Sequence, residues 1–378
     1  MRILFVGLTT HYTEKLKYQG NIFNKILFNK GYEILFLADM QYFDNGELKI
    51  SKSTEFLDEN GVKIIRIPYL ISNSLGSKFK LFKNIYKYIE GFKPDIIYCH
   101  SPQYFSVFEV VRYKKRHPEV KVYADTHTSF LNYKKGFLSY WLLYKIYYRT
   151  LYKTLEPYLE KYFYIGLGEK EFSEKVYNAN PSKMEFLPLG GEEIINEKYS
   201  KYRKEIRDKY NINNNDIMLF HSGKLSKDKN TDWLIKAVNK VNNKNVKLFI
   251  AGSIPKENLE LKDSIIANKS IIYVGWISGD ELIKYLCACD LYCQPGAPSV
   301  TLQTAICSKA PILCYKHDFY SYLYDYNSIL WIKNVDDIVN NISNIVNNKN
   351  ILEELKKNAD KNSCKLDTEY LLNKALGV

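Results

Sequence analysis

The sequence predicts an α/β protein with two doubly wound domains in tandem. Short, continuously apolar strands alternate with polar, amphipathic segments of helix length through the whole chain. Each half also opens with a strand that runs into a turn, and 378 residues exceed what one ordinary core accommodates. Continuous apolar strands separated by helices indicate parallel sheets that are covered on both faces. We therefore expect two Rossmann-like units.

The strands follow from their apolar runs and bounding turn residues. In the first half we expect Arg2–Leu8, Tyr32–Ala38, Val62–Ile67, Asp95–His100, Val120–Asp125, Tyr162–Gly166 and Met184–Pro188. In the second half we expect Ile217–Ser222, Val246–Gly252, Ile271–Val274, Leu291–Gln294, Pro311–Tyr315 and Ser328–Ile332.

The domain boundary is expected where a proline and two glycines end a strand, between Leu187 and Glu192. This predicts a first domain over residues 1–190 and a second over residues 191–355. The segment Ile351–Leu376 has helical periodicity. We expect residues 356–378 to form a C-terminal helix that crosses back to the first domain.

The net charge of the chain limits which classes of partner are expected. Fifty-four basic against forty-two acidic residues give a net charge of +12. Nucleic acid is not expected as a partner, because the lysines form no concentrated stripe and no binding module is present. Two explanations of the positive charge remain. One is attraction to an anionic substrate or membrane surface, and the other is a codon bias toward Lys, Asn, Ile and Tyr.

Three absences in the sequence bear on location. No apolar stretch reaches the roughly 18 residues of a transmembrane helix. The apolar run before Thr9 is too short for a signal peptide and is typical of a first buried strand. The seven cysteines lack metal-ligand spacing and lie mainly on apolar segments, which predicts reduced, buried thiols. The expected location is the cytoplasm.

Residues 133–163 interleave aromatic and aliphatic side chains with Lys134, Lys135, Lys145, Arg149 and Lys153. One interpretation is an interfacial helix that rests on anionic lipid headgroups, at the cytoplasmic face of a membrane. The other is a core helix whose lysines extend to solvent. The sequence leaves both open.

A loop in the second half predicts a phosphate site. The apolar strand ending at Ser222 breaks at Gly223 into a loop that carries Lys224, Lys227 and Lys229, and a helical pattern begins at Thr231. In a strand–glycine turn–helix unit, backbone N–H groups and the helix dipole point at one spot and favour anions. A diphosphate is the expected ligand.

The segments around this loop resemble retaining GT-B glycosyltransferases of the large family-4 type, which use nucleotide-diphosphate sugars. In the second half the resemblance rests on Ser222–Lys229, Leu248–Gly252, Val274–Ile277, Ala288–Tyr292 and Gln303–Pro311, in that order and spacing. In the first half it rests on Lys93–His100 and Val122–His127, with Glu185–Gly190 similar to the inter-domain strand. The resemblance implies two domains facing each other across a cleft.

The resemblance also implies roles for the loop lysines and for one histidine. Lys224 stands where the family usually has an arginine and Lys229 where it has a lysine, and both would hold the donor diphosphate. Two cations beside a leaving diphosphate stabilise its developing charge, which replaces a metal. No metal or other cofactor is expected. His127 matches the histidine that approaches the donor sugar.

The donor-binding residues follow from the same resemblance. Besides Ser222 and Gly223 they include Trp276 and Ile277, whose backbone would lie along the base, and Ser278–Glu281 then predicts a capping box. The family's two glutamates, seven residues apart, are replaced by Gly296 and Thr304. The remaining candidates are Gln303 as a neutral ribose ligand and the N–H groups of Ser299, Val300 and Thr301 as a phosphate cap.

The acceptor side is expected at Thr9, Thr10, His100 and Ser101, which end the first and the fourth expected strands. Threonines stand at positions 9 and 10 where the family usually has glycines. The sequence thus predicts a hexosyltransferase-type enzyme (EC 2.4) that moves a sugar from a UDP- or GDP-sugar to a glycan or lipid-linked polysaccharide precursor, with retention. A nucleotide-sugar epimerase of GT-B architecture and a degenerate, non-catalytic partner protein are the alternatives.

Overall fold

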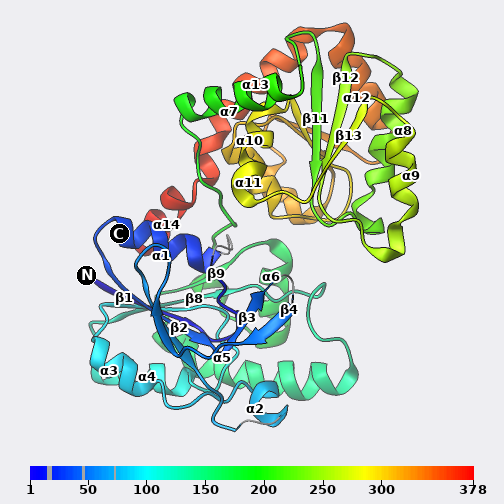
Figure 1. The fold of residues 1–378 in the computed structure, drawn as a ribbon. Helices are drawn as coiled ribbons and strands as arrows, with labels where there is room; N and C mark the ends of the chain where they lie inside the picture. Colours follow the sequence, from blue (N-terminus) through cyan, green and yellow to red (C-terminus); the bar gives the residue numbers. More distant parts are fainter. Residues whose placement is uncertain (15–18, 45–46, 72–73) are drawn as a thin grey trace. The chain divides into compact units, whose positions relative to one another are not determined.

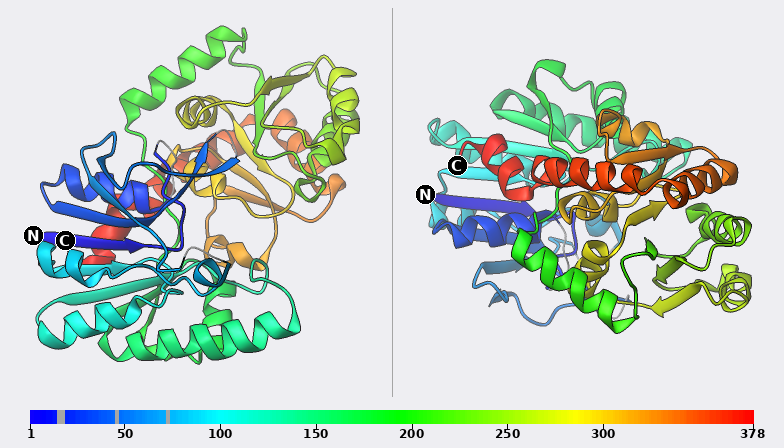
Figure 2. Two further views of the ribbon diagram at one scale, coloured as in Figure 1. Left: turned by 60° about the horizontal axis from the view of Figure 1, so that its bottom comes forward. Right: turned by 90° about the horizontal axis from the view of Figure 1, so that it is seen from above.

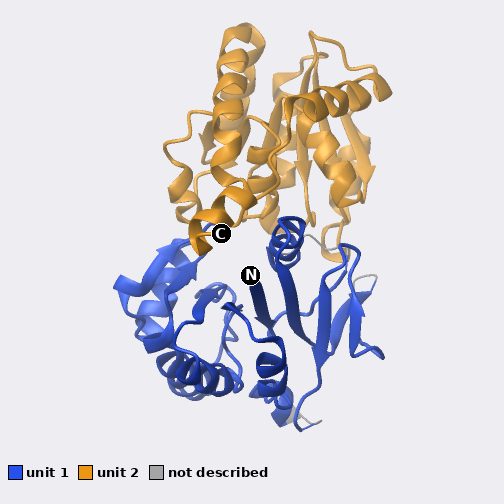
Figure 3. Ribbon diagram, turned by 90° about the vertical axis from the view of Figure 1, so that its left-hand side faces the viewer, with its two compact units in different colours: residues 1–188 blue, residues 189–378 orange. Residues whose placement is uncertain are grey.

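The computed structural model describes residues 1–14, 19–44, 47–71 and 74–378. The chain divides into two compact units, residues 1–188 and residues 189–378 (Figure 3). The division falls two residues before the expected Gly190. Each unit is built on its own sheet, as the alternation of strands and helices predicted.

The sheet of the first unit has the strand order β10-β9-β8-β7-β1-β2-β6-β5 (Figure 1). All neighbours pair in parallel except β5, which is antiparallel to β6. The strands are β1 (Arg2–Gly7), β2 (Glu33–Asp39), β5 (Glu55–Leu57), β6 (Lys63–Ile67), β7 (Ile96–Cys99), β8 (Lys121–Thr126), β9 (Lys161–Tyr164) and β10 (Met184–Phe186).

Helices cover this sheet and close the first core. They are α1 (Gln19–Asn29), α2 (Ser74–Lys78), α3 (Tyr86–Phe92), α4 (Val107–Arg116), the π-helix η1 (Ser139–Tyr148), α5 (Arg149–Leu155) and α6 (Leu167–Phe172). Figure 2 shows η1 and α5 as one long rod. Its buried face carries Leu143, Tyr144, Tyr148 and Leu151, so the segment 133–163 contributes to the core on one side.

The sequence did not predict three short strands in the first unit. β3 (Gln41–Asp44) and β4 (Glu47–Ile50) form an antiparallel pair of their own, and β5 extends the main sheet. All residues of β4 are exposed, and β5 is largely so. A strand without a buried face has no apolar periodicity, so hydrophobic pattern could not reveal it.

The second sheet is entirely parallel, with the order β13-β12-β11-β14-β15-β16. Its strands are β11 (Ile217–Ser222), β12 (Val246–Ala251), β13 (Ile271–Gly275), β14 (Leu291–Gln294), β15 (Ile312–Tyr315) and β16 (Ile329–Ile332). In both halves every expected strand is present within two residues of its predicted ends.

Two apolar clusters cover the two faces of the second sheet. The helices are α7 (Asn196–Lys209), α8 (Thr231–Val241), α9 (Glu260–Ile266), α10 (Gly279–Ala288), α11 (Thr301–Cys307), α12 (Val335–Asn347), α13 (Lys349–Ser363) and α14 (Thr368–Leu376). The C-terminal helical segment is therefore two helices, and Asp367 caps the second through the Tyr370 N–H (3.0 Å). Both lie in the second unit, and their expected crossing to the first domain stays a prediction.

Both sheets reverse their strand order beside their first strand. In the first unit, β2 and β6 lie on one side of β1, and β7 to β10 lie on the other. In the second unit, β12 and β13 flank β11 on one side and β14 to β16 on the other. Ligands of doubly wound sheets bind at the carboxyl ends of the strands beside such a reversal. Ligands are thus expected at two edges, β1/β7 and β11/β14.

Two other expectations meet the structure. No helix in the described part of the chain is long and apolar enough to cross a membrane. All seven cysteines are free thiols, and six are buried as predicted, but Cys364 is exposed. It lies in the short turn between α13 and α14, where only Leu366 is buried.

Candidate functional site

The carboxyl edge of the second sheet is shaped by glycine. Gly223 follows β11 with φ +135° and Gly252 follows β12 with φ +132°. A Cβ atom at Gly252 would lie 1.7 Å from the Gly223 carbonyl oxygen, whereas one at Gly223 would meet nothing within 4 Å. The turn after β11 is therefore open on the side where a side chain would stand. A ligand can approach this backbone closely.

Lys229 joins the two loops that flank the reversal of strand order. Its Nζ donates to the carbonyl oxygens of Ala297 (2.9 Å) and Pro298 (2.8 Å) in the loop after β14. Burial lowers the pKa of the half-buried ammonium, while Asp228 acts in the opposite direction. An ammonium group has three hydrogens, so one remains for a ligand.

The two loops are packed backbone to backbone. The Ala297 N–H donates to the Asp228 carbonyl at 2.9 Å. A Cβ at Gly296 would lie 2.3 Å from that same oxygen, so this position has no room for a side chain. The loop around Gly296 is thus built without the glutamate that the family resemblance placed there. In this conformation the packed loops leave no room for a glutamate side chain at position 296.

The other two lysines of the loop differ in their surroundings. Lys224 is exposed, and among the described residues it pairs with no acidic group. Lys227 is also exposed but lies 3.2 Å from the Glu260 carboxylate. Lys224 and Lys229 are therefore the cations that this loop can offer to an anion, and their role in holding a diphosphate stays a prediction. Lys227 provides a matched comparison.

His221, which the sequence reasoning did not select, supports the loop from beneath. It is fully buried on β11, with Nδ1 2.8 Å from the Cys293 carbonyl and Nε2 3.0 Å from the Thr231 hydroxyl. Burial lowers its pKa to about 4, and the Lys229 charge acts in the same direction. The ring is neutral at pH 7, donates through Nδ1 and ties β11, β14 and the start of α8 together.

The predicted phosphate cap at the start of α11 is partly occupied by the protein. The Ser299 N–H donates to the Tyr320 hydroxyl (2.8 Å), and the Thr301 N–H donates to the Ser299 Oγ (3.3 Å). Val300 is 64% exposed. A phosphate bound here would have to replace two internal hydrogen bonds, so this part of the predicted donor site is less prepared than the Lys229 loop.

Gln303 and Thr304 lie deeper in α11 than a ribose ligand requires. The Gln303 side chain is 2% exposed, and its Nε2 donates to the Tyr322 hydroxyl at 2.8 Å. Its Oε1 has no hydrogen-bond partner among the described residues. Thr304 faces Gly191, where an added Cβ would lie 3.1 Å from the Thr304 Cα. In this conformation the Gln303 side chain is not presented to solvent as a free ligand group, whereas Thr304 is partly exposed.

Trp276 and Ile277 differ in their exposure to solvent. Trp276 follows the left-handed Gly275 and is 77% exposed, whereas Ile277 packs against the core. The predicted capping box is confirmed: Ser278 Oγ accepts from the Glu281 N–H, and the Glu281 carboxylate accepts from the Ser278 N–H. The box fixes the start of α10 and leaves the indole ring in solvent.

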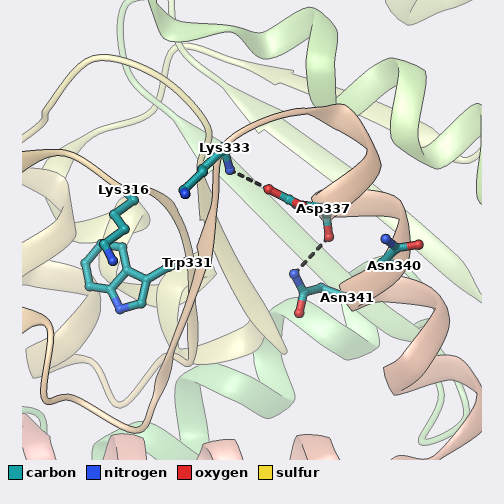
Figure 4. A pocket seen from close by; sticks show the side chains of 6 residues that line it. All are labelled: Lys316, Trp331, Lys333, Asp337, Asn340 and Asn341. Carbon is teal, nitrogen blue, oxygen red and sulfur yellow. Dashed lines mark hydrogen bonds between the residues drawn. The ribbon is translucent and has the colours of Figure 1, made fainter.

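A separate hollow of about 280 Å³ opens beside α12, past the ends of β15 and β16 (Figure 4). Its lining consists of Lys316, Trp331, Lys333, Asp337, Asn340 and Asn341. The Asp337 carboxylate accepts from the Lys333 backbone N–H at 2.7 Å. None of the predicted donor residues lines this hollow, so it lies outside the predicted donor site.

The carboxyl edge of the first sheet gathers two histidines around one buried carboxylate. Asp125, at the end of β8, accepts from His100 Nδ1 (2.8 Å) after β7 and lies 3.4 Å from His127 Nε2. The two imidazole rings are 4.5 Å apart. Asp125 also accepts from the Tyr98 hydroxyl (3.0 Å) and from the Ser101 N–H (2.8 Å).

The electrostatics of this cluster keep Asp125 ionised. Burial by itself raises the pKa of Asp125, but the charges and hydrogen bonds of His100 and His127 outweigh it and hold that pKa well below its usual range. The charged carboxylate fixes His100 with its Nδ1 proton inward. One ring nitrogen of each histidine remains for a substrate.

The same three side chains are the group in the described chain whose ligand atoms lie close enough for a metal ion, within 4.8 Å of one another. Both Asp125 oxygens already accept hydrogens, including those of Tyr98 and Ser101. The expectation that no metal takes part stays a prediction.

The predicted acceptor residues Thr9 and Thr10 belong to this edge. The Thr9 hydroxyl donates to the carbonyls of Ser101 (3.1 Å) and His100 (3.3 Å), and the Thr10 hydroxyl donates to Gly7 (3.2 Å). Thr9 therefore fastens the loop after β1 to the loop after β7, and Thr10 closes the turn at the end of β1. Side-chain hydroxyls here do the positioning that close backbone packing of glycines would otherwise do.

The chain is similar to known proteins in the sequence of its second unit and in its fold. Residues 202–362 match the sequence profile described as glycosyl transferases group 1. This region contains the glycine-shaped edge, the lysine loop and the loop after β14. Residues 202–362 are a group 1 glycosyltransferase domain. The chain is accordingly a glycosyltransferase that depends on a nucleotide sugar. Among curated proteins no sequence matches it.

Solved structures resemble this glycosyltransferase over its whole length. A glycosyltransferase from Rickettsia africae has a TM-score of 0.70 at 15% identity, with 100% of this chain and 97% of that chain covered. Anabaena HepE in complex with UDP has a TM-score of 0.69 at 12% identity, with 100% and 98% covered. WaaG, a glycosyltransferase involved in lipopolysaccharide biosynthesis, has a TM-score of 0.59 at 16% identity, with 99% and 98% covered. The fold is therefore GT-B.

The structure also adds residues to the glycosyltransferase that sequence reasoning missed. Asp125 stands two positions before His127 at a strand end, and that spacing puts both on one face of the strand. Together with His100 at the end of the neighbouring strand, this spacing could have indicated the cluster from the sequence. Nothing in the sequence singled out His221, because a histidine inside an apolar strand is usually a buried structural residue.

Proposed function

We propose that this glycosyltransferase binds a UDP- or GDP-sugar at the Lys229 loop of its second unit and transfers the sugar, with retention, to a glycan or lipid-linked polysaccharide precursor. The observation that carries the proposal is the open turn at Gly223 with Lys224 and Lys229 beside it, at the reversal of strand order. HepE, which shares the fold, is described in complexes with UDP and with UDP-glucose. That favours UDP over GDP.

The lysine loop can supply the chemistry without a metal. Breaking the bond between sugar and diphosphate builds negative charge on the leaving group, and fixed cations stabilise it. Lys229 is held by two carbonyl oxygens, so its charge is already in place and half removed from water. Lys224 is free to swing onto the outer phosphate. Neither step requires the acidic residues that the family has at positions 296 and 304.

In the first unit, His127 takes the role that the resemblance implies, contact with the donor sugar near the reacting carbon. Asp125 and His100 would hold the edge that receives the acceptor hydroxyl. A histidine whose inner nitrogen is fixed by a carboxylate presents its outer nitrogen in a defined direction. This arrangement suits the orientation of a hydroxyl and the passage of its proton.

Isothermal titration with UDP and with GDP tests the donor site. Lys229→Ala is expected to weaken binding by about 1–3 kcal/mol, roughly 5- to 150-fold, the range of a charged hydrogen bond. Lys227→Ala is the matched control, since Lys227 is exposed and paired with Glu260, and it should change the affinity little. Wild-type protein that binds neither nucleotide would refute the proposal. Incubation with UDP-glucose alone separates an epimerase, which converts it, from a transferase.

The long rod of the first unit favours a peripheral position on a membrane. Large apolar side chains are exposed on η1, at Trp141, Leu142 and Ile146, and in the segment that precedes it, at Leu131, Phe137 and Leu138. Lys134 and Lys135 are exposed beside them. An apolar surface flanked by lysines suits anionic headgroups, here at the cytoplasmic membrane face. This is the surface that a lipid-linked acceptor would require.

Flotation with phosphatidylglycerol vesicles tests the membrane surface. Wild-type protein is expected to float with the vesicles, and a variant with Lys134, Lys135, Lys145 and Arg149 replaced by glutamate is expected to stay at the bottom. Vesicles of neutral phosphatidylcholine provide the control, because they lack the charge that the lysines recognise. Equal flotation of both variants on anionic vesicles would remove this part of the proposal.

A further inference from the structure

Lys80 stands in an unusual backbone position in the first unit. It follows α2 and has φ +51°, in the left-handed region that lysine rarely adopts. The chain around it is fixed: Leu70 donates to the Leu81 carbonyl (2.7 Å), and Lys83 donates to the Pro68 carbonyl (3.0 Å). A strained conformation inside a well-bonded segment is common where a side chain must be aimed.

The same segment is attached to the edge that carries the predicted acceptor residues. The Phe105 N–H donates to the Lys80 carbonyl at 3.2 Å, and Phe105 lies four positions after Ser101. Tyr69, which pairs across the bridge with Phe82, comes two residues after the end of β6. The backbone of Lys80 is therefore bonded to the segment between β7 and α4, which begins with His100 and Ser101.

The Lys80 ammonium pairs with no anionic group among the described residues. It lies 3.5 Å from the Tyr69 hydroxyl and 6.0 Å from the centre of the Tyr69 ring, and no carboxylate of the described residues lies within 4.0 Å. Burial lowers the pKa of Lys80, and the Asp39 charge opposes that shift. A cation withdrawn from water without a counterion is unfavourable. Lys78, two residues earlier, is by contrast exposed.

The nearby carboxylate cannot serve as that counterion, because it is already engaged. Asp39 is fully buried, and its Oδ2 lies 2.7 Å from His11 Nδ1. Arg66, also buried, donates to the backbone carbonyls of Asp39 (3.0 Å) and Tyr12 (2.8 Å). Asp39 therefore has hydrogen-bond partners of its own, and the Lys80 ammonium forms no ion pair with it.

We propose that the Lys80 ammonium and the Tyr69 hydroxyl form an anion subsite that binds a phosphate group of the acceptor. The subsite deepens the proposed function and rests on it, since it assigns the acceptor to the phosphate-bearing class. Tyr69 supports the ammonium as a neutral donor: burial raises its pKa to about 12, so the hydroxyl keeps its proton at neutral pH. A phosphate would accept from both groups and supply the missing charge.

Competitive acetylation of lysines in the full-length protein, read by peptide mass spectrometry, tests the subsite. UDP is kept saturating so that the Lys229 loop is filled, and phenyl phosphate is the probe. At a probe concentration ten times its dissociation constant, acetylation of Lys80 is expected to fall about tenfold. Lys78, the internal control, should be unaffected, and phenyl glucoside, which has no charge, should protect neither lysine. Unchanged acetylation of Lys80 in phenyl phosphate would overturn the inference.

A substitution supplies the second readout. In UDP-saturated protein, phenyl phosphate should raise the melting temperature of wild type and of Lys80→Arg but not of Lys80→Met, which keeps the length of the side chain. UDP alone should raise the melting temperature of all three. If UDP binds and the phosphate effect is absent from wild type, the subsite fails alone. If UDP does not bind, the proposed function fails.

Vesicles distinguish the two sources of phosphate. Phosphatidic acid vesicles and free phenyl phosphate should both protect Lys80, because both present a phosphate monoester. Protection by vesicles without protection by phenyl phosphate would mean that a membrane merely covers this segment, and that result would also overturn the subsite.

Discussion

Asp125 offers the most direct test of how the first unit is built. Its carboxylate receives hydrogen bonds from Tyr98, His100 and Ser101, with His127 at 3.4 Å. Asp125→Asn preserves shape but replaces one acceptor oxygen by an NH₂ group and removes the charge. Hydrogen bonds to a buried charge contribute about 1.5–3 kcal/mol each. We expect the free energy of unfolding to fall by about 3 kcal/mol at pH 7.

The pH dependence separates the charge from the shape. A carboxyl whose pKa is depressed in the folded state stabilises the fold above its ordinary pKa of about 3.9 and loses that effect as pH falls through the folded value. The pKa of Asp125 is depressed by His100 and His127. The stability difference between wild type and Asp125→Asn should therefore hold from pH 7 to about pH 4 and shrink below it.

Urea unfolding followed by circular dichroism measures this difference, and hydrogen exchange of the β7 and β8 peptides assigns it to the first unit. Tyr98→Phe is the matched control, because it removes one donor and leaves the carboxylate charged. It should cost about 1 kcal/mol. Asp125→Asn with wild-type stability at pH 7, or a stability difference that does not change with acid, would refute the reasoning.

Three further predictions concern the second unit. Gly252→Ala should lower the free energy of unfolding in urea by more than about 3 kcal/mol, because its Cβ would lie 1.7 Å from the Gly223 oxygen at φ +132°. Gly31→Ala is the control: an added Cβ there meets nothing within 4 Å, so the loss of stability should be about 1 kcal/mol. Equal losses in the two variants would contradict this prediction. His221 has a pKa of about 4 in the folded protein, so as the pH falls it binds a proton at a lower pH than in the unfolded chain. The free energy of unfolding should therefore drop by about 3 kcal/mol between pH 6.5 and pH 4. A His221→Gln variant that shows the same pH dependence would exclude His221 as its source. Cys364 should react with Ellman's reagent in the folded protein while the six buried thiols do so only on unfolding; fast reaction of more than one thiol would show otherwise.

Elements with a buried face could be predicted from the sequence. β11 is buried at every position and appears in the sequence as an unbroken apolar run. The helix after it begins at Thr231 and ends at Val241, as the pattern indicated. The exposed β3–β4 pair and β5 escaped prediction, because strands without a core contact are not marked by hydrophobic periodicity.

The candidate site divides along the same line. Gly223 and Lys229 were accessible from sequence because a glycine turn between a strand and a helix is a local feature. That Lys229 donates to the carbonyl oxygens of Ala297 and Pro298 was not accessible, since 68 residues separate Lys229 from Ala297. Gly296 shows the same limit: only the packed loops explain why no side chain stands there.

The amino-acid sequence by itself determined the strands with a buried face, the tandem domains and the lysine-bearing turn, because each depends on neighbours within a few positions. Tertiary structure alone decided which strand ends meet. Sheet order brings His100 and His127 to one carboxylate, and loop packing places Lys80 in a half-buried position without an acidic partner among the described residues. The reason is physical: desolvation and hydrogen-bond geometry depend on distance in space, which local sequence pattern does not contain.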